Sequence, residues 1–372
     1  MEKRVFEKLG VEASLLGFGC MRFPLDEQGE IDEKQAEEMI DLAISKGVNY
    51  IDTAYPYHDG KSEPFVGKVL KKYNRKDFYL ATKLPIWKIN SQEEAREIFE
   101  SQLKRLDVDY VDFYLLHALD KDKWEKIKEY HLIELCEELR QAGKIKYLGF
   151  SFHDEYPVFE EILTSYHWDF CQLQLNYMDM NIQAGQKGVD LANKLNIPLV
   201  VMEPIKGGSL ASLPENVTNM FKDYNQEASL ASWALRYVGT LPGVKVILSG
   251  MSTLEQVKDN LITFENYQNL NQEEQSIVQK VSDTLHSRMK NGCTGCAYCM
   301  PCPFGVNIPA NFKYWNNCFV YEDEKTFKGK YQAMLDKEKA SQCKQCGVCE
   351  KMCPQQLPIR EDLKRVVQDM EG

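Results

Sequence analysis

The sequence of 372 residues has no long apolar run and no excess of positive charge. Because a membrane-spanning helix needs about eighteen or more consecutive apolar residues, we expect no segment that crosses a membrane and no membrane partner. The 45 lysines and arginines are outnumbered by 56 aspartates and glutamates, so the formal net charge is -11. Proteins that bind nucleic acids neutralise phosphates with clustered positive charge, and a nucleic-acid partner is therefore not expected.

A complete glycine-rich dinucleotide motif is also missing. In a doubly wound sheet, Gly-x-Gly-x-x-Gly follows the first strand. Here Gly17-Phe18-Gly19 is followed by Cys20-Met21-Arg22, so the third glycine is absent. The glycine pair is better interpreted as a tight turn at the opening of a barrel, and a doubly wound sheet remains the competing architecture.

Cysteine, in contrast, is plentiful near the end of the chain. Of twelve cysteines, eight form two runs, each followed by proline: Cys293, Cys296, Cys299 and Cys302, then Cys343, Cys346, Cys349 and Cys353. The second run has the ligand spacing of bacterial ferredoxins, and the first has one residue fewer before its fourth cysteine.

This spacing predicts two 4Fe-4S clusters. Thiolates at i, i+3 and i+6 can hold three corners of one cube, while the proline directs the fourth thiolate to a neighbouring cube. We therefore expect each cluster to take three ligands from one run and one from the other. The expected ligand sets are Cys293, Cys296, Cys299 and Cys353 for one cluster and Cys343, Cys346, Cys349 and Cys302 for the other.

Zinc and disulfides are the alternatives for these cysteines. Structural zinc sites take paired Cys-x-x-Cys units with a longer spacer, and disulfide frameworks suit small secreted proteins that carry a signal peptide. Neither pattern fits this chain. We expect a reducing compartment, the cytoplasm, and core positions for Cys20, Cys136, Cys171 and Cys318.

The first part of the chain alternates between short apolar runs and amphipathic stretches, a pattern typical of parallel strands joined by helical crossovers. The expected strands cover residues 15–18, 50–54, 78–84, 113–117, 147–151, 170–175, 199–203 and 246–249. The expected helices cover residues 33–46, 63–72, 92–106, 129–142, 157–164, 183–195, 228–237 and 254–261. Eight strand–helix units in about 250 residues predict a (β/α)8 TIM barrel, an α/β fold with catalytic groups at the C-terminal ends of its strands.

We divide the chain into a barrel over residues 1–265, a connecting helix within 266–290 and an iron-sulfur domain over 291–372. The two cysteine runs are separated by residues 303–342, a longer spacer than in small ferredoxins. This spacer has an aromatic stretch at 312–321 and a charged helix expected around 331–339. A small, mainly helical ferredoxin-like domain is therefore predicted.

Three consecutive predicted strands deliver ionisable side chains. The second leads into Asp52 and Tyr57, the third ends in Lys83, and the fourth ends in His117. Because the strand ends of a barrel meet at one rim, we expect these four side chains to lie together. An acid, a phenol, an ammonium and an imidazole in this arrangement can reduce a carbonyl group.

The chemistry assigns a role to each of the four. A tyrosine with an ordinary pKa of about 10 is a poor proton donor near neutrality, and Lys83 would lower the pKa of Tyr57 by favouring the phenolate. Asp52 would hold Lys83 charged and in place, and His117 would orient the carbonyl oxygen. Taken alone, His117 could instead be a satisfied core histidine.

These motifs resemble those of the aldo/keto reductase superfamily in order and spacing. The matching segments are Asp52-Thr53-Ala54-x-x-Tyr57, Ser62-Glu63, Thr82-Lys83, Leu116-His117, Gly149-Phe150-Ser151 and Gln172-x-Gln174-x-Asn176-Tyr177. The resemblance covers about residues 1–265, and with its cysteine-rich end the whole chain resembles the ferredoxin-containing branch of that superfamily. It implies that NAD(P)H lies across the barrel rim, and that Asp52, Tyr57, Lys83 and His117 are catalytic.

The resemblance also implies positions that bind the cofactor. Ser151, His153 and Gln172 would lie near the carboxamide. The pyrophosphate loop and the adenosine segment would use Pro204, Lys206, Gly207, Gly208, Ser249, Gly250, Ser252, Gln256 and Asn260. Met202 stands where relatives have a stacking aromatic residue, and no arginine or lysine in 251–253 could clamp a ribose phosphate. NADP(H) and NAD(H) therefore both remain open.

The function expected from these parts is that of an oxidoreductase acting on a small carbonyl or alcohol, with the clusters connecting the site to a redox protein partner. Hydride transfer moves two electrons and a cluster usually passes one, so a flavin in this chain or in a partner could mediate, although no separate flavin motif is present. Two alternatives are a nicotinamide-dependent reductase with purely structural clusters and a redox-sensing accessory subunit.

Overall fold

The computed structural model describes all residues from 1 to 372, and these form two compact units. The barrel unit comprises Met1–Gly207 and Ala231–Gln272, and the C-terminal unit comprises Gly208–Leu230 and Glu273–Gly372. The second boundary falls within the connecting segment that we predicted at 266–290. The grouping of residues 208–230 with the C-terminal unit was not anticipated by the sequence analysis.

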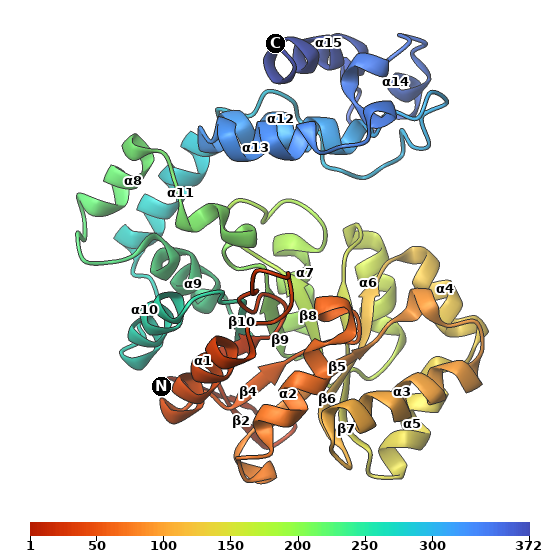
Figure 1. Ribbon diagram of the computed structural model, residues 1–372, viewed down its shortest axis with the longest axis vertical. Helices are drawn as coiled ribbons and strands as arrows, with labels where there is room; N and C mark the ends of the chain where they lie inside the picture. Colours follow the sequence, from red (N-terminus) through yellow and green to blue (C-terminus); the bar gives the residue numbers. More distant parts are fainter. The chain divides into compact units, whose positions relative to one another are not determined.

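The barrel unit is built on a closed barrel of eight parallel strands in the order β10-β3-β4-β5-β6-β7-β8-β9 (Figure 1). The strands are β3 (Leu16–Gly19), β4 (Tyr50–Asp52), β5 (Tyr79–Leu84), β6 (Val111–Leu119), β7 (Ile145–Phe152), β8 (Phe170–Gln174), β9 (Leu199–Met202) and β10 (Val244–Ser249). This confirms the predicted TIM barrel, with every expected strand present.

Nine helices follow these strands along the chain. They are α1 (Glu33–Ser45), α2 (Ser62–Leu70), α3 (Gln92–Leu106), α4 (Lys121–Glu129), α5 (Leu132–Gln141), α6 (Tyr156–Ser165), α7 (Gly185–Lys194), α9 (Leu230–Thr240) and α10 (Leu254–Glu265). Side-chain caps begin several of them, as at α3, where Ser91 Oγ accepts a hydrogen bond from Glu94 N at 3.2 Å. The helix expected at 129–142 begins only at Leu132, because His131 adopts a left-handed conformation with φ 51° and separates it from α4.

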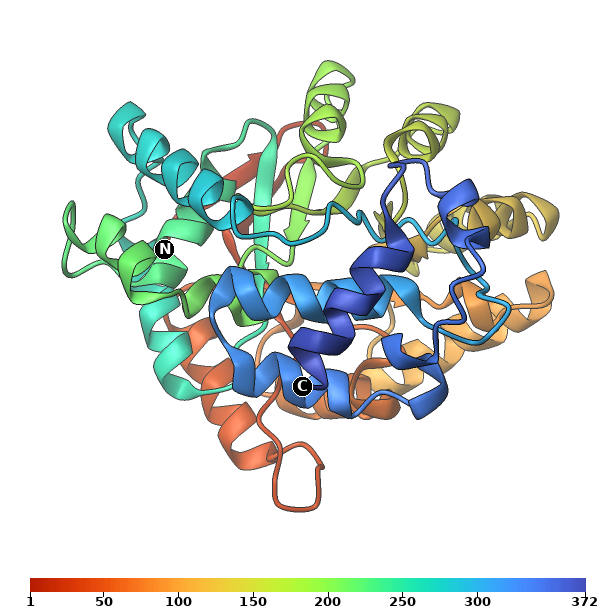
Figure 2. The ribbon, with the colours of Figure 1, turned by 90° about the horizontal axis from the view of Figure 1, so that it is seen from above.

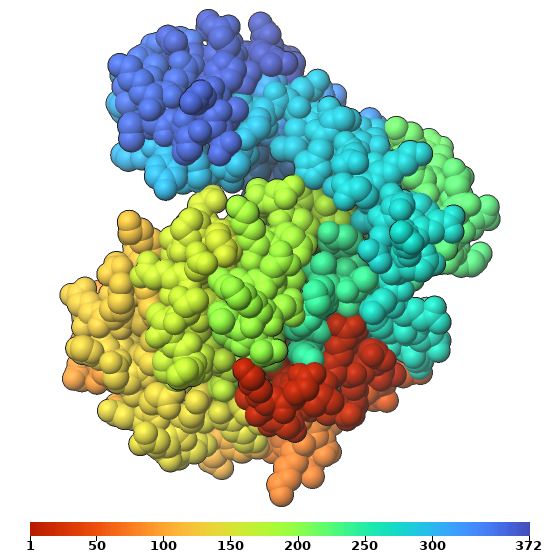
Figure 3. All heavy atoms as spheres, turned by 180° about the vertical axis from the view of Figure 1, so that it is seen from behind, coloured from red at the N-terminus to blue at the C-terminus, as the bar shows by residue number.

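A β-hairpin that the sequence analysis missed precedes the barrel. Strands β1 (Lys3–Phe6) and β2 (Val11–Ser14) pair antiparallel, and their residues lie at the surface of the barrel unit in red in Figure 3. Phe6 and Val11 pack with Tyr50 and Phe113 from the early residues of β4 and β6. The hairpin therefore adds apolar side chains at the N-terminal end of the barrel, away from the strand ends that carry the predicted site.

The C-terminal unit is helical, with α8 (Glu215–Lys222), α11 (Gln272–His286), α12 (Ile308–Tyr321), α13 (Glu324–Gln332), the short α14 (Val348–Met352) and α15 (Ile359–Met370). The aromatic stretch at 312–321 lies in α12. The charged helix expected around 331–339 was wrong, because α13 is capped by Asp323 and ends at Gln332. Short 3-10 turns at Asp336–Glu338 and Ala340–Gln342 follow.

Helices α12 and α15 cross and contact each other in this unit (Figure 2). Trp315 of α12 is fully buried and donates from its indole Nε1 to Asp369 Oδ2 of α15 at 2.8 Å. At the other end, the buried Asn291 donates to Asp362 Oδ2 at 2.6 Å. The first of these bonds joins α12 to α15, and the second fixes the start of the first cysteine run to α15, the helix that follows the second run. None of the helices in the structure combines the length and the apolar character that crossing a membrane requires.

Gly149 of β7 provides a test of the barrel packing. A Cβ atom there would lie 2.7 Å from the carbonyl oxygen of Phe170 in β8. We expect Gly149→Ala to lower the free energy of unfolding of the barrel unit by about 1–3 kcal/mol, as overpacked sites do, in urea denaturation followed by circular dichroism. Gly329→Ala in α13 is the matched control, since its Cβ would meet no atom within 4 Å. Unchanged stability of Gly149→Ala would contradict the close strand approach.

Candidate active site and cysteine cavities

The candidate active site is the layer of side chains directly above the apolar filling of the barrel. That filling includes Tyr50, Ala81, Leu115, Phe170 and Val200, one from each of five strands. Residues two positions further along a strand point the same way and lie one layer closer to the C-terminal end. These residues are Asp52, Lys83, His117, Gln172 and Met202, so strand periodicity alone brings the predicted polar groups together at one rim.

Lys83 is the centre of this layer. Its side chain is fully buried, and Nζ donates to Asp52 Oδ1 at 2.6 Å and to the carbonyl oxygen of Thr53 at 2.7 Å. Burial lowers the pKa of Lys83, but Asp52 and Tyr57 together outweigh it and hold the pKa above its ordinary value. Lys83 is therefore a charged ammonium at neutral pH.

Tyr57 lies beside this ammonium. It begins the 3-10 turn Tyr57–Gly60 after β4, and Lys83 Nζ lies 4.9 Å from the centre of its ring. Burial raises the pKa of Tyr57 above its ordinary value, and the ammonium of Lys83 opposes this without reversing it. The net lowering of the phenol pKa that we expected from Lys83 is thus not found, because desolvation of the phenolate outweighs the neighbouring charge.

His117 completes the group of four. Its ring lies edge-on to that of Tyr57, with 6.1 Å between the ring centroids. Burial, followed by the charge of Lys83, keeps the pKa of His117 well below its ordinary value, so the imidazole is neutral. Its Nδ1 is buried without a hydrogen-bond partner. A neutral imidazole with one N–H group can donate to a substrate oxygen.

Trp87 is a residue of this site that the sequence analysis missed. It lies in the 3-10 turn Ile86–Lys88 just after β5, with its ring centroid 5.1 Å from that of His117, and it is 43% exposed. Its place four residues after Lys83 was the available signal, since loops that follow barrel strands form the site. Trp87 therefore supplies an apolar wall next to His117.

Two side chains on β7 and β8 fit the carboxamide of a nicotinamide. Ser151 Oγ accepts from Ala118 N at 2.7 Å, which leaves its own hydroxyl proton to donate. Gln172 Oε1 is buried without a partner and can accept, while its Nε2 lies 3.3 Å from Met202 Sδ. One donor and one acceptor are what a carboxamide needs. His153, one residue after β7, is exposed.

The residues expected at the pyrophosphate loop lie in a turn after β9. Lys206 donates to Asp179 Oδ1 at 2.6 Å, and Pro204 is buried. Gly207 and Gly208 have φ angles of 65° and 98°, in the region that favours glycine, and their Cβ positions face open space. The backbone of this turn is therefore accessible.

The residues expected at the adenosine segment are in part already bonded to each other. Asn260 Nδ2 donates to Ser249 Oγ at 2.9 Å, and both are buried. Ser252 N donates to Gln256 Oε1 at 2.8 Å. Ser249, Asn260 and the Gln256 carbonyl thus stabilise the segment itself.

The structure also brings a cation to this segment, where the sequence analysis had found none. Arg22, in the turn after β3, packs its side chain against Gly250, and its carbonyl oxygen accepts from Ser252 Oγ at 2.8 Å. The side chain of Arg22 is exposed. Arg22 and Gly250 are far apart in the sequence, so only the neighbouring positions of β3 and β10 in the barrel reveal this cation.

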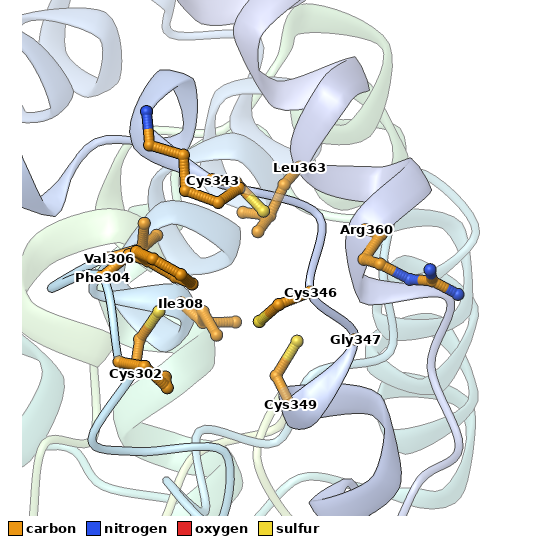
Figure 4. Close-up of a pocket in the computed structure, with 12 residues that line it drawn as sticks. Cys302, Phe304, Val306, Ile308, Cys343, Cys346, Gly347, Cys349, Arg360 and Leu363 are labelled. Carbon is orange, nitrogen blue, oxygen red and sulfur yellow. The ribbon is translucent and has the colours of Figure 1, made fainter.

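The eight cysteines of the two runs line two cavities in the C-terminal unit. The first has a volume of about 340 Å³ including its open mouth and is lined by Cys302, Cys343, Cys346 and Cys349. Their sulfur atoms turn toward a common space, whereas the guanidinium of Arg360 points away from it (Figure 4). The second, of about 320 Å³, is lined by Cys293, Cys296, Cys299 and Cys353. The cavities thus divide the cysteines as the expected ligand sets do, three from one run and one from the other.

The surroundings of the sulfurs fit iron-sulfur clusters. Cys343 Sγ accepts hydrogen bonds from Gln345 N at 3.5 Å and Nε2 at 3.4 Å, and Cys293 Sγ accepts from Gly295 N at 3.4 Å. Such N–H···S bonds stabilise cluster thiolates. All twelve cysteines are free thiols in the structure.

Comparison with known proteins agrees with both parts of this description. Residues 15–283 match the model of the aldo/keto reductase family, and residues 292–363 match that of a 4Fe-4S dicluster domain. The chain is 28% identical over 309 residues to an uncharacterized oxidoreductase, YqkF, of Bacillus subtilis, covering 75% of this chain and 96% of that protein. It is 24% identical over 305 residues to the NADH-specific methylglyoxal reductase of Escherichia coli, covering 69% of this chain and 90% of that protein.

A solved structure shows the same fold. The aldo-keto reductase AKR11C1 from Bacillus halodurans, in its holo form, superposes with a TM-score of 0.63 at 29% sequence identity, covering 76% of this chain and 96% of that chain. The chain therefore belongs to the aldo/keto reductase family, as an oxidoreductase that carries a 4Fe-4S dicluster domain after its barrel.

Proposed function

We propose that the barrel unit interconverts a small carbonyl compound and its alcohol with a nicotinamide dinucleotide, and that Tyr57 is the general acid and base. The observation that carries this proposal is the buried ammonium of Lys83, which bonds Asp52 and lies beside the phenol of Tyr57. The name of the Escherichia coli relative makes small aldehydes, with NADH, the first substrates to test.

Each residue of the site has a definite task in this reaction. A nicotinamide bound beside Tyr57 would supply the hydride that the carbonyl carbon accepts. Tyr57 gives its phenol proton to the carbonyl oxygen, and the ammonium of Lys83 stabilises the phenolate that is left. The neutral imidazole of His117 donates a hydrogen bond to the same oxygen and orients it. Ser151 and Gln172 hold the carboxamide, so that the reacting carbons face each other.

The C-terminal unit holds, in this proposal, two 4Fe-4S clusters in its two cysteine-lined cavities. Each turnover leaves the nicotinamide oxidised or reduced, and the clusters would carry single electrons between that nicotinamide and an external redox protein, which would return it to its starting state. Because hydride transfer moves two electrons, a group that splits the pair, such as a flavin in this chain or in the partner, would be needed. Cysteines that are to bind clusters must not be oxidised to disulfides, which requires a reducing compartment, and we infer the cytoplasm.

Tyr57→Phe tests the general acid. This change removes only the hydroxyl group, so we expect the kcat for methylglyoxal reduction with NADH or NADPH to fall by at least about 100-fold. The iron content should not change. Tyr55→Phe is the matched control, because the guanidinium carbon of Arg105 lies 4.1 Å from the centre of the Tyr55 ring and the Tyr55 hydroxyl has no role in the proposal. Full activity of Tyr57→Phe would remove Tyr57 from the mechanism.

The pH dependence of reduction follows from the two shifted groups. Because its pKa is raised above the ordinary value of about 10, the phenol of Tyr57 stays protonated at least up to that pH. Because its pKa is depressed below the ordinary value of about 6.5, the imidazole of His117 stays neutral at least down to that pH. We therefore expect kcat/KM for methylglyoxal reduction to stay level between about pH 6.5 and 10. An inflection inside this window, measured with enzyme that remains folded, would contradict these assignments.

The clusters are tested by cysteine replacement and by electron transfer. Cys346→Ala at the first cavity should lose iron, acid-labile sulfide and visible absorbance, whereas Cys318→Ala, a buried cysteine of α12 that lines neither cavity, should keep them. In the intact protein, anaerobic NADH should then bleach the cluster absorbance. If dithionite bleaches it and NADH and NADPH do not, the clusters are structural or take electrons from another donor.

A further inference from the structure

Behind Lys83, on the outer side of the barrel wall, lies a second set of buried polar groups. Thr82 is the neighbour of Lys83 on β5, and its side chain points away from the barrel interior, toward α2 and α3. There it meets Glu63 of α2 and Gln102 of α3, and all three side chains have no exposed surface. The Ser62-Glu63 motif of the sequence, which the proposed reaction does not use, thus lies directly behind the active-site lysine.

The contacts within this set are specific. Glu63 Oε1 accepts from Thr82 Oγ1 at 2.6 Å and from Gln102 Nε2 at 2.8 Å. Gln102 Nε2 also donates to the peptide carbonyl of Lys83 at 3.0 Å, and its Oε1 accepts from the Tyr114 hydroxyl at 2.8 Å. Glu63 is therefore linked to the backbone of Lys83 through one amide group.

Glu63 acts here as a carboxylate. Burial raises the pKa of Glu63 above its ordinary value, and the hydrogen bonds from Thr82 and Gln102 offset this only in part, so the assignment as a carboxylate rests on its partners. Arg105, a partly exposed residue of α3, adds a donor to Oε2 at 3.2 Å. The Thr82 hydroxyl, the Gln102 amide and the Arg105 guanidinium all donate hydrogen bonds to Glu63. An amide or a protonated acid at this position would place its own donor group against one of these donors.

The helices that hold the carboxylate are themselves tightly placed. At Gly67, one turn after Glu63, a Cβ atom would lie only 2.5 Å from the carbonyl oxygen of Leu106 at the end of α3. This close approach leaves α2 and α3 little freedom to shift. The neighbouring Ser62 Oγ lies 2.8 Å from Thr53 Oγ1, and Thr53 is the residue whose carbonyl accepts from Lys83 Nζ.

We propose that Glu63 is a positioning residue for Lys83. Its carboxylate holds Thr82 and Gln102, and Gln102 holds the peptide of Lys83, so that the ammonium stays at Asp52 and beside Tyr57. The inference rests on the proposed role of Lys83 in the reaction. Glu63 touches neither substrate nor cofactor, so its loss changes the rate of the chemical step and leaves binding intact.

The test compares Glu63→Gln and Thr82→Val with the unchanged chain in methylglyoxal reduction. Both changes keep the side-chain volume, and each removes one member of the contact set. We expect kcat to fall on the order of 10- to 100-fold, as for a displaced catalytic group, with KM and the Kd for NADH within about twofold. Thr82→Ser, which keeps the hydroxyl donor, should restore most of kcat. Expressing kcat per NADH-binding site, titrated by fluorescence, removes any effect of unfolded protein.

Asp112→Asn provides the matched control. Asp112 is another buried carboxylate of this wall, paired with Arg75 at 2.6 Å and Lys146 at 2.9 Å, but it lies near the start of β6, away from the strand ends. Asp112→Asn should lower the free energy of unfolding of the barrel unit without lowering kcat per NADH-binding site.

Three outcomes separate the inference from the proposed function. A normal kcat in Glu63→Gln and Thr82→Val, with an inactive Tyr57→Phe, overturns the positioning role alone. A loss of kcat in Asp112→Asn as large as in Glu63→Gln also overturns it, because any buried carboxylate would then have the same effect. A fully active Tyr57→Phe, or an unchanged chain that binds neither NADH nor NADPH, overturns the proposed function itself.

Discussion

A buried ammonium is the constraint on which the barrel mouth depends. Lys83 has no exposed surface, and a charge in that position is stable only if oxygen atoms surround it. Asp52 and the Thr53 carbonyl provide them at 2.6 and 2.7 Å. Removing one partner of such a pair typically costs about 3–5 kcal/mol, because the other charge stays buried without compensation. The end of β4 and the end of β5 are therefore held together by the ammonium that lies 4.9 Å from the ring centre of Tyr57.

Residues on both faces of β5 contribute to the position of the Lys83 ammonium. Lys83 points into the barrel, and its neighbour Thr82 points out toward α2 and α3, as the alternation of a strand requires. The inner face meets Asp52 and Tyr57, and the outer face meets Glu63 and Gln102. Lys83 and the outer set are fully buried, and each polar side chain of the outer set has a hydrogen-bond partner there. A buried set that is fully satisfied in this way rigidifies the surrounding backbone.

In the C-terminal unit, polar contacts between distant segments hold the loops that carry the cysteines. Its cysteine runs lie mostly in loops, so helix packing alone gives those loops little support. Polar anchors at Asn291, Asp362 and Trp315 join the helices that flank the two runs. Cysteines from both runs line each cavity. A cluster in either cavity would cross-link distant segments, so cluster binding and folding of this unit are expected to depend on each other.

Much of this could be derived from the sequence, for physical reasons. The alternation of apolar runs and amphipathic stretches determined the barrel, since eight strand–helix units have few other ways to bury their apolar faces. The positions of Asp52, Lys83 and His117 at strand ends followed from the same pattern. Local spacing likewise determined which cysteines belong to each run. All of these signals are contained in short stretches of chain.

Only the tertiary structure decided the rest, because it depends on residues that are distant in sequence. Arg22 reaches Gly250 because β3 and β10 are neighbours in the closed barrel. The pKa of Tyr57 is raised because burial, which no motif encodes, outweighs the charge of Lys83. Glu63 meets Gln102 because α2 and α3 pack closely at Gly67. Sequence determined which chemical groups are present and on which strand each lies, whereas packing determined their partners and their charge.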